Sequence, residues 1–299
     1  MRVDPNYVTG LVGSLNQVAA NEQKLTEQLS TGVTVNALSD NPAAAGQNVL
    51  LTSRLNADDT FSQTASSVES LLQVGDSALG NVVSQLTSAI TLATQANNGT
   101  LSASNEQAIA LQLSGIRDEV LSLANSSYMG QYIFAGSQGS APPFSIDTTT
   151  SPATVTYSGD SKVSQVRTPS GQQIATNVPG DQIFTSGPNV LATLNNLISD
   201  ISGGASSGAL ATDLSSLNSA LNHVSQQRVV LDDSITRLKA AGTYSGSESL
   251  QLKAAQNSLI QTDTAKVASQ LSTTETQQSA LIQVIAAVDQ QGTLFDMLH

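Results

Sequence analysis

Apolar residues recur at every third or fourth position in five segments of this chain. Three of the segments are residues 65–93, 109–123 and 210–238. The same spacing occurs near both ends, over residues 8–29 and 267–288. Steps of three and four residues keep apolar side chains on one narrow face of an α-helix, as in a coiled coil or a slender bundle. The pattern therefore predicts long helices that pack along apolar stripes.

Capping and turn signals predict where these helices begin and end. Asn41-Pro42 favours a helix start, because Asn can cap the first turn and Pro is already fixed near the helical φ. A capping-box pattern at residues 104–107 predicts another start. Residues 242–246 predict an interruption, and Asp263 is expected to disturb the last helix. The predicted helices span residues 1–29, 42–97, 104–127, 188–201, 209–240 and 248–289.

From Gly130 the pattern changes to short runs rich in β-branched and aromatic residues. These runs are residues 132–134, 155–157, 163–168, 174–178 and 182–184. Turn sequences containing Gly, Pro and Asp separate them, which is typical of a small antiparallel β unit. We therefore expect a mainly α fold with a small β insert (α+β). The N- and C-terminal halves would form an elongated antiparallel helical bundle or coiled coil, with a small antiparallel β domain at its tip.

The expected organisation has five parts. Residues 1–41 form an N-terminal assembly helix and a connection, and residues 42–130 form the N-terminal half of a helical rod. Residues 131–187 form the β-rich tip, residues 188–264 the C-terminal half of the rod, and residues 265–299 a C-terminal assembly helix.

The apolar stripes at the two ends predict self-assembly. A thin two-helix pair cannot cover both stripes, so neighbouring copies of the chain would complete their burial, at roughly 1.5–3 kcal/mol for each Leu or Ile. Short isolated helices are weak in water, so residues 1–40 and 265–299 are expected to become ordered only on assembly. The stripe residues expected at this interface are Val8, Leu11, Leu15, Val18, Leu25, Leu29, Val267, Leu271, Leu281, Ile285 and Val288.

The composition excludes several classes of protein. Only 11% of the 299 residues are charged and 3% are aromatic, which suits helices that bury Leu, Val, Ile and Ala. The net charge is −12 and the 11 basic residues do not cluster, so no nucleic-acid partner is expected. The chain has no Cys, which excludes disulfides, thiolate metal sites and a Cys nucleophile.

The chain also has no segment that predicts membrane insertion, which needs roughly 18 consecutive apolar residues. The first 13 residues lack the continuous apolar core of a cleaved signal peptide. If the protein is exported, we expect a route that reads a different signal.

No set of residues predicts catalysis, a cofactor or a metal site. His223 lies beside an apolar helix position, where a surface histidine or one satisfied by a hydrogen bond is expected. The adjacent pair Asp232 and Asp233 would point about 100° apart on a helix, so we interpret both as solvated. Asp58 and Asp59 receive the same interpretation. Because no nucleophile or acid–base set is present, an enzyme is the weakest hypothesis.

Arg228 interrupts the apolar stripe of residues 210–238. Its aliphatic stem could lie along the edge of the stripe while its guanidinium reaches water. Alternatively, a buried ion pair could fix the register between two helices. The sequence leaves both possibilities open, and Arg228 is the candidate residue for setting the register.

Both chain ends carry motifs that resemble the bacterial flagellin-like axial proteins. Residues 28–32 (QLSTG) and residues 35–45 (VNALSDNPAAA) are similar to the family's helix end, spoke segment and next helix start. Residues 294–298 (LFDML), which include Leu294 and Phe295, resemble its short C-terminal tail. The resemblance implies that the spoke and helix start comprise Gly32, Asn36, Asp40, Asn41 and Pro42.

Within this family, the motifs resemble the hook-associated protein 3 branch more than filament flagellin. They comprise the start MRV, Pro42, residues 131–136 (QYIFAG), 142–144 (PPF), 157–160 (YSGD) and 179–184 (PGDQIF). Val33 and Thr34 depart from the family, which commonly has two basic residues there. Any contact that those charges make in the family is therefore not expected here.

The resemblance implies a structural component of the bacterial flagellum, an adaptor layer that joins hook-side proteins to the flagellin filament. Its implied partners are sister subunits in a ring layer, a hook-associated protein on the hook side and flagellin on the filament side. It also implies export without a cleaved signal peptide, after a cytoplasmic export chaperone has bound the C-terminal helix. A filament-forming flagellin is the alternative, and a helical binding or adhesion module with a β tip is a second one.

Overall fold

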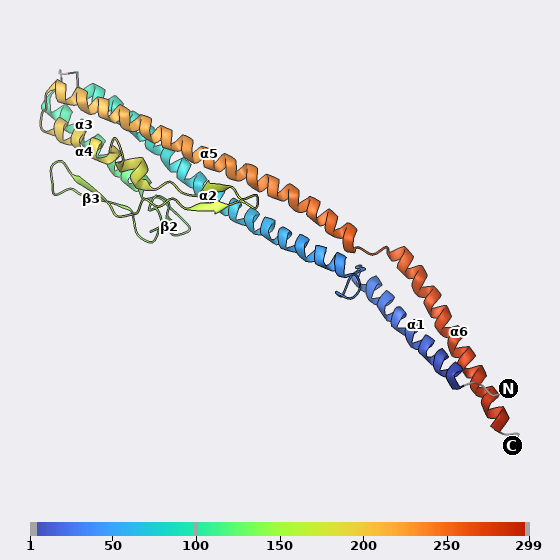
Figure 1. Ribbon diagram of the computed structural model, residues 1–299. Helices are drawn as coiled ribbons and strands as arrows, with labels where there is room; N and C mark the ends of the chain where they lie inside the picture. The colour runs from blue at the N-terminus through green and yellow to red at the C-terminus, as the bar shows by residue number, and fades with distance from the viewer. Residues whose placement is uncertain (1–4, 99–100, 297–299) are drawn as a thin grey trace. The chain divides into compact units, whose positions relative to one another are not determined.

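The computed structural model describes residues 5–98 and 101–296, and the side chains of residues 9–98 and 101–288. Long helices dominate it, and the short strands follow one another in a single stretch of the chain (Figure 1). The predicted mainly α fold with a small β insert is therefore confirmed. The helices are α1 (Pro5–Thr31), α2 (Pro42–Ala96), α3 (Ala103–Ala124), α4 (Val190–Ser202), α5 (Ser207–Ile260) and α6 (Thr264–Asp296). The strands are β1 (Ser127–Tyr128), β2 (Gln131–Tyr132), β3 (Phe144–Asp147), β4 (Thr154–Tyr157), β5 (Gln165–Arg167) and β6 (Gln173–Ala175).

The chain divides into two compact units. The terminal unit comprises Met1–Asn56 and Glu248–His299, and the central unit comprises Ala57–Ser247. Both α2 and α5 contribute to each unit, because the boundaries fall inside these two helices.

Within the central unit, α2 and α5 run antiparallel along the predicted stripes. Residues early in this part of α2 meet residues late in α5: a Cβ atom on Gly242 would lie 3.8 Å from the Cβ of Ala65. Later in α2, a Cβ on Gly75 would lie 3.9 Å from Leu231. The α3 and α4 helices pack against each other and complete the core. Stripe residues that are almost fully buried include Leu72, Leu79, Val82, Leu86, Leu113, Leu217, Val224, Leu231 and Leu238.

The β region is built from three separate hairpins, in which β1 pairs with β2, β3 with β4 and β5 with β6, all antiparallel. The β3 strand did not stand out in the sequence. The expected strand at residues 182–184 is wrong, because a single π-helical turn, η1 (Asp181–Thr185), occupies this position. In that turn Ile183 and Phe184 both point into the core, which a strand's alternating faces would not allow.

Four aromatic rings gather the hairpin segments into the core. Phe144 contacts Tyr157 at 4.9 Å and Phe184 at 5.2 Å between ring centroids, and Phe134 contacts Phe184 edge-on at 5.7 Å. Gly180 permits this packing, since a Cβ there would lie 2.7 Å from the carbonyl oxygen of Phe134 and 2.8 Å from the Phe144 ring. The aromatic and glycine positions of the family-like motifs therefore serve core packing.

The predicted interruption at residues 242–246 is wrong, because α5 continues through it. Gly242 lies against Ala65, and the hydroxyl of Ser245 donates to Asp58 at 2.8 Å. The glycines of this segment favour a break, but close packing against α2 keeps the segment helical. The disturbance expected at Asp263 is present: α5 ends at Ile260, and Asp263 accepts a hydrogen bond from the Lys266 amide at the start of α6.

The start predicted for α3 is displaced by two residues. Ser102 caps this helix, accepting a hydrogen bond from the Asn105 amide, whereas the sequence pattern placed the capping box at residues 104–107. Within the terminal unit, α1 packs against α6, and the two helices lie side by side (Figure 1). In the same unit the ends of α2 and α5 are joined by the amide of Gln256, which donates to Asn48 at 2.7 Å.

Candidate assembly interface

The paired terminal helices α1 and α6 carry most of the side chains expected at an assembly interface. Nearly all of these stripe residues are only partly buried in the monomer, and Val267 alone among those described is fully buried. The partly buried members are Leu11, Leu15, Val18, Leu25, Leu271, Leu281, Ile285 and Val288. Leu29 is exposed. Val8, Leu294 and Phe295 lie outside the residues whose side chains the structure describes.

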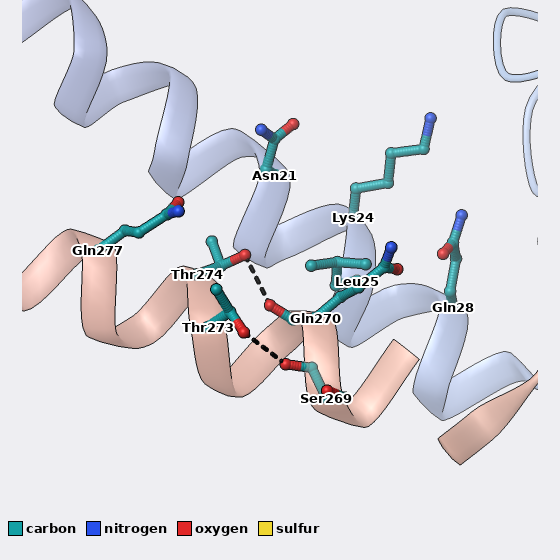
Figure 2. Close-up of a pocket in the computed structure, with 9 residues that line it drawn as sticks. All are labelled: Asn21, Lys24, Leu25, Gln28, Ser269, Gln270, Thr273, Thr274 and Gln277. Atoms are coloured by element: carbon teal, nitrogen blue, oxygen red, sulfur yellow. Dashed lines mark hydrogen bonds between the residues drawn. The ribbon is translucent and has the colours of Figure 1, made fainter. Parts of the chain in front are cut away.

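A groove of about 370 Å³ runs between α1 and α6, and its lining is mostly polar. Figure 2 shows Leu25 of α1 directed at α6 among hydroxyl and amide side chains. The hydroxyls of Thr273 and Thr274 donate to the carbonyls of Ser269 and Gln270 in their own helix. The sequence pattern did not predict this polarity, although Gln and Thr residues interrupt the C-terminal apolar stripe.

Apolar side chains also lie outside the predicted stripes. In the terminal unit, Val49, Leu50 and Leu250 are 66–70% exposed. Val12 on α1, and Ile282 and Val284 on α6, are exposed as well. Apolar surface of this kind marks sites of association when it is contiguous. These residues were not predicted from the sequence, because the expected interface was confined to the apolar stripes of α1 and α6.

The spoke positions form a compact connection between α1 and α2. Gly32 has a φ of +70°, a backbone conformation that residues other than glycine rarely adopt. Asp40 accepts hydrogen bonds from the amides of Asn36 and Ala37 and pairs with Lys24 at 2.8 Å. The hydrogen bond from Lys24, followed by the one from the Ala37 amide, lowers the pKa of Asp40 below its usual value.

The second helix begins at the position that the sequence indicated. The side chain of Asn41 accepts a hydrogen bond from the Ala44 amide at 3.1 Å, and Pro42 is the first residue of α2. Asn41 therefore satisfies one of the free amides of the first turn.

Arg228 forms a two-pronged ion pair with Asp76 on α2. Its Nε and Nη2 atoms donate to the two carboxylate oxygens at 2.8 and 3.0 Å. The side chains are 34% and 24% exposed, so the pair lies at the edge of the stripe and is not fully buried. The hydrogen bond to Asp76 raises the pKa of the guanidinium.

Other polar residues singled out in the sequence lie in different environments. The Nε2 atom of His223 lies 2.7 Å from the carbonyl oxygen of Gln182. Asp232 and Asp233 are exposed. The interpretation of Asp58 as solvated is wrong, because Asp58 is 2% exposed. It lies between α2 and α5 and accepts a hydrogen bond from Ser245, while its Oδ2 atom has no hydrogen-bond partner among the described residues.

A pair of carboxyls that the sequence analysis did not identify joins α4 to α5. Burial, followed by the charge of Asp200, raises the pKa of Asp213 to about 6. The Oδ2 atom of Asp213 is buried and finds no donor among the described residues, so a proton shared with Asp200 would satisfy it. Residue spacing in the sequence does not reveal this pair, because Asp200 and Asp213 come close only when α4 packs beside α5.

The described part of the chain has neither a metal-binding cluster nor a membrane-spanning helix. No three residues of the types His, Cys, Asp and Glu lie close enough there to hold a metal ion. Over the same residues, none of the helices has an apolar stretch that could span a bilayer.

Comparisons with known proteins agree with the motifs. Residues 11–139 match the family model for the bacterial flagellin N-terminal helical region. Flagellar hook-associated protein 3 of Salmonella typhimurium is 33% identical over 181 residues, which cover 60% of this chain and 55% of that protein. Flagellin B of Vibrio cholerae is 32% identical over 127 residues, 42% of this chain and 34% of that protein.

Among solved structures, the flagellar junction protein FlgL from Legionella pneumophila has a similar fold. It matches 72% of this chain and 100% of its own length, with a TM-score of 0.59 and 17% identity. The chain spans 55% and 59% of the length of the two curated hook-associated protein 3 relatives that it matches. Together these findings confirm the resemblance to flagellin-like axial proteins of the hook-associated protein 3 type.

Proposed function

Since the chain is similar to flagellin-like axial proteins of the hook-associated protein 3 type, we propose that it is a structural component of the bacterial flagellum. It would form an adaptor layer between hook-side proteins and the flagellin filament. The observation that carries this proposal is the state of the terminal helices. They pair with each other, yet their stripes remain partly exposed and further apolar side chains face outward.

Sister subunits would complete the burial of these helices. Each partly buried Leu or Ile would gain a fraction of the roughly 1.5–3 kcal/mol that full burial provides. A hook-associated protein would contact one face of the resulting layer and flagellin the other. The protein would reach its extracellular position without a cleaved signal peptide, accompanied in the cytoplasm by a chaperone bound to the C-terminal helix.

The Arg228–Asp76 pair would fix the register of α2 against α5. If α2 slid along α5 by one heptad, the apolar stripes would still find similar Leu, Val and Ala contacts. The two hydrogen bonds between Arg228 and Asp76, in contrast, can form in only one register. A shift by one heptad would leave both charges unpaired at a partly desolvated edge.

A filament-forming flagellin is the alternative function, and the similarity to flagellin B supports it. Self-association separates the two. A flagellin alone forms long filaments, whereas a junction protein stops at one layer and requires a different neighbour on each face. The second alternative, a helical binding or adhesion module, would keep its binding activity after removal of residues 1–40.

Deletion of the gene, followed by electron microscopy, tests the proposal. The expected result is complete hooks without filaments, together with secreted but unattached flagellin, and restoration by the intact gene. A complementing copy that lacks residues 1–40 should fail to restore filaments. Normal filaments on the deletion strain would refute the junction role.

A further inference from the structure

The turn between β1 and β2 in the central unit contains an unfavourable residue for its backbone conformation. The turn consists of Met129 and Gly130, because Tyr128 pairs with Gln131 across the hairpin. The φ angles of Met129 and Gly130 are +51° and +81°. Two positive values are what a type I′ turn requires, and Asn-Gly adopts this turn most readily. Among the described residues, Met129 is the only one other than glycine that has a positive φ.

Met129 does not compensate for this strain by packing within the chain. Its side chain is 85% exposed, the highest value among the exposed large apolar residues that the structure describes. The base of the hairpin is nevertheless fixed, since Ile133 is buried and would lie 3.4 Å from a Cβ atom on Gly75 of α2. Strained backbone of this kind is found mainly where function requires it. The turn therefore holds a large apolar side chain in water at a cost to the monomer, which favours a contact with another molecule.

The same unit contains an open groove of about 460 Å³ between α3 and α4. Four apolar residues line it, namely Ala110, Leu111, Ile198 and Ile201. Leu111 is 69% exposed, so part of this apolar lining faces water. The α4 helix ends beside the groove, and Gly203 and Gly204 line it without adding a side chain that could fill it. The groove can therefore accept an apolar side chain from outside.

The groove and the Met129 turn lie toward opposite ends of α3. Ala110 lies roughly 21 Å along the helix from its last residue, Ala124, at about 1.5 Å per residue. The β1 strand follows directly with Ser127, and the contact of Ile133 with α2 holds the hairpin in place. Met129 is therefore kept away from the groove of its own copy, which leaves that groove available to the turn of another copy.

We propose that Met129 of one copy inserts into the α3–α4 groove of a neighbouring copy. The unbranched, flexible side chain of Met suits an irregular apolar groove. Because the turn and the groove are different surfaces, each copy offers both, and the contact repeats in one direction as in a ring or a helical layer. The inference rests on the proposed function, since it names the contact that would join sister subunits in the layer.

Disulfide trapping tests this contact directly, because the chain has no Cys. Met129→Cys places a thiol on the turn, and Gln107→Cys places one in the lining of the groove. Oxidation of the double variant, in concentrated solution and on isolated flagella, should give a ladder of covalent multimers. Each single variant should stay monomeric, and a mixture of the two should give only dimers.

The matched control combines Met129→Cys with Val229→Cys, at an exposed residue of α5, and should give no ladder. Dimers of the Met129→Cys variant alone would indicate a symmetric contact and would overturn the proposal. So would the absence of a ladder from the Met129→Cys, Gln107→Cys double variant both in solution and on flagella. Both results would leave the junction function standing.

Met129→Asn separates the fold from the contact. Asn favours the turn conformation, so the midpoint of thermal unfolding of the full-length monomer should rise by roughly 1–3 °C. The same variant should be secreted normally but restore fewer filaments to the deletion strain than the intact gene does, whereas Met129→Leu should restore them. A lower midpoint, or full restoration by Met129→Asn, would overturn the proposal. Normal filaments on the deletion strain itself would refute the junction function instead.

Discussion

The two units use the same three-four spacing and reach different degrees of burial. In the central unit the stripes of α2 and α5 are covered by each other, by α3 and α4, and by the aromatic cluster. In the terminal unit α1 and α6 have only each other, and Ala44, Leu55 and Val267 are the apolar residues that become buried among those described. A periodic stripe therefore specifies a helix, whereas the number of neighbouring elements decides how much free energy its burial contributes.

The largest expected difference concerns truncation of matched stripe leucines. Leu79→Ala, in the central unit, should lower the free energy of unfolding by about 3 kcal/mol, because it leaves a cavity in a closed core. Leu25→Ala, in the terminal unit, should cost about 1 kcal/mol or less, since its side chain is already partly solvated. Urea unfolding measures both values, and equal costs would contradict the difference between the units.

The ion pairs provide a smaller contrast. Arg228→Met should cost about 1 kcal/mol after allowing for partial solvent screening, and a double-mutant cycle with Asp76→Asn should assign most of it to the pair. The control is Arg54→Met. Arg54 lies in the terminal unit, is 67% exposed and forms a longer ion pair of 3.7 Å with Glu248. The expected cost of this substitution is below about 0.5 kcal/mol. A coupling energy of zero for Arg228 and Asp76 would exclude the register role.

The Asp200–Asp213 pair predicts a pH dependence confined to the central unit. The pKa of Asp213, about 6, lies above the ordinary value of 3.8, so the folded chain binds this proton more tightly than the unfolded chain. The resulting stabilisation is complete below about pH 4 and is lost as the pH rises through 6.

Asp213→Asn, measured by thermal unfolding across this range, should remove that pH dependence. At pH 7 it should raise stability by roughly 0.5–1 kcal/mol, a value discounted for solvent exposure. Glu119→Gln, a carboxyl-to-amide change at an exposed position of α3, is the control and should leave the pH profile unchanged. A profile for Asp213→Asn identical to that of the unaltered protein would contradict a shared proton.

The smallest expected effect on the monomer is at the outward-facing apolar residues. Val284→Ser on α6 should change monomer stability by less than about 0.5 kcal/mol, because the side chain is 42% exposed. Under the proposed function it should nevertheless reduce self-association, which sedimentation measures. Val229→Ser, equally conservative and on α5 of the central unit, is the control. Equal loss of association in both variants would remove the special role of the terminal unit.

Much of the architecture was predictable because it depends on local chemistry. The start of α2 at Pro42, the break near Asp263 and the paired terminal helices follow from capping residues and from the period of the apolar pattern. The assembly interface stays a prediction. The stripe residues lie on the paired helices α1 and α6, but a single apolar face gave no indication of the polar groove or of the outward-facing Val284.

The sequence by itself determined the helical segments, the mainly α class and the resemblance to flagellin-like proteins, since periodicity, caps and motifs are written in neighbouring residues. Only the tertiary structure decided that α5 continues through residues 242–246, that Asp58 is buried and that Asp213 meets Asp200. Each of these depends on which residue of another helix lies opposite. Local spacing describes one face of one helix, whereas burial, hydrogen bonding and protonation depend on the surface that covers that face.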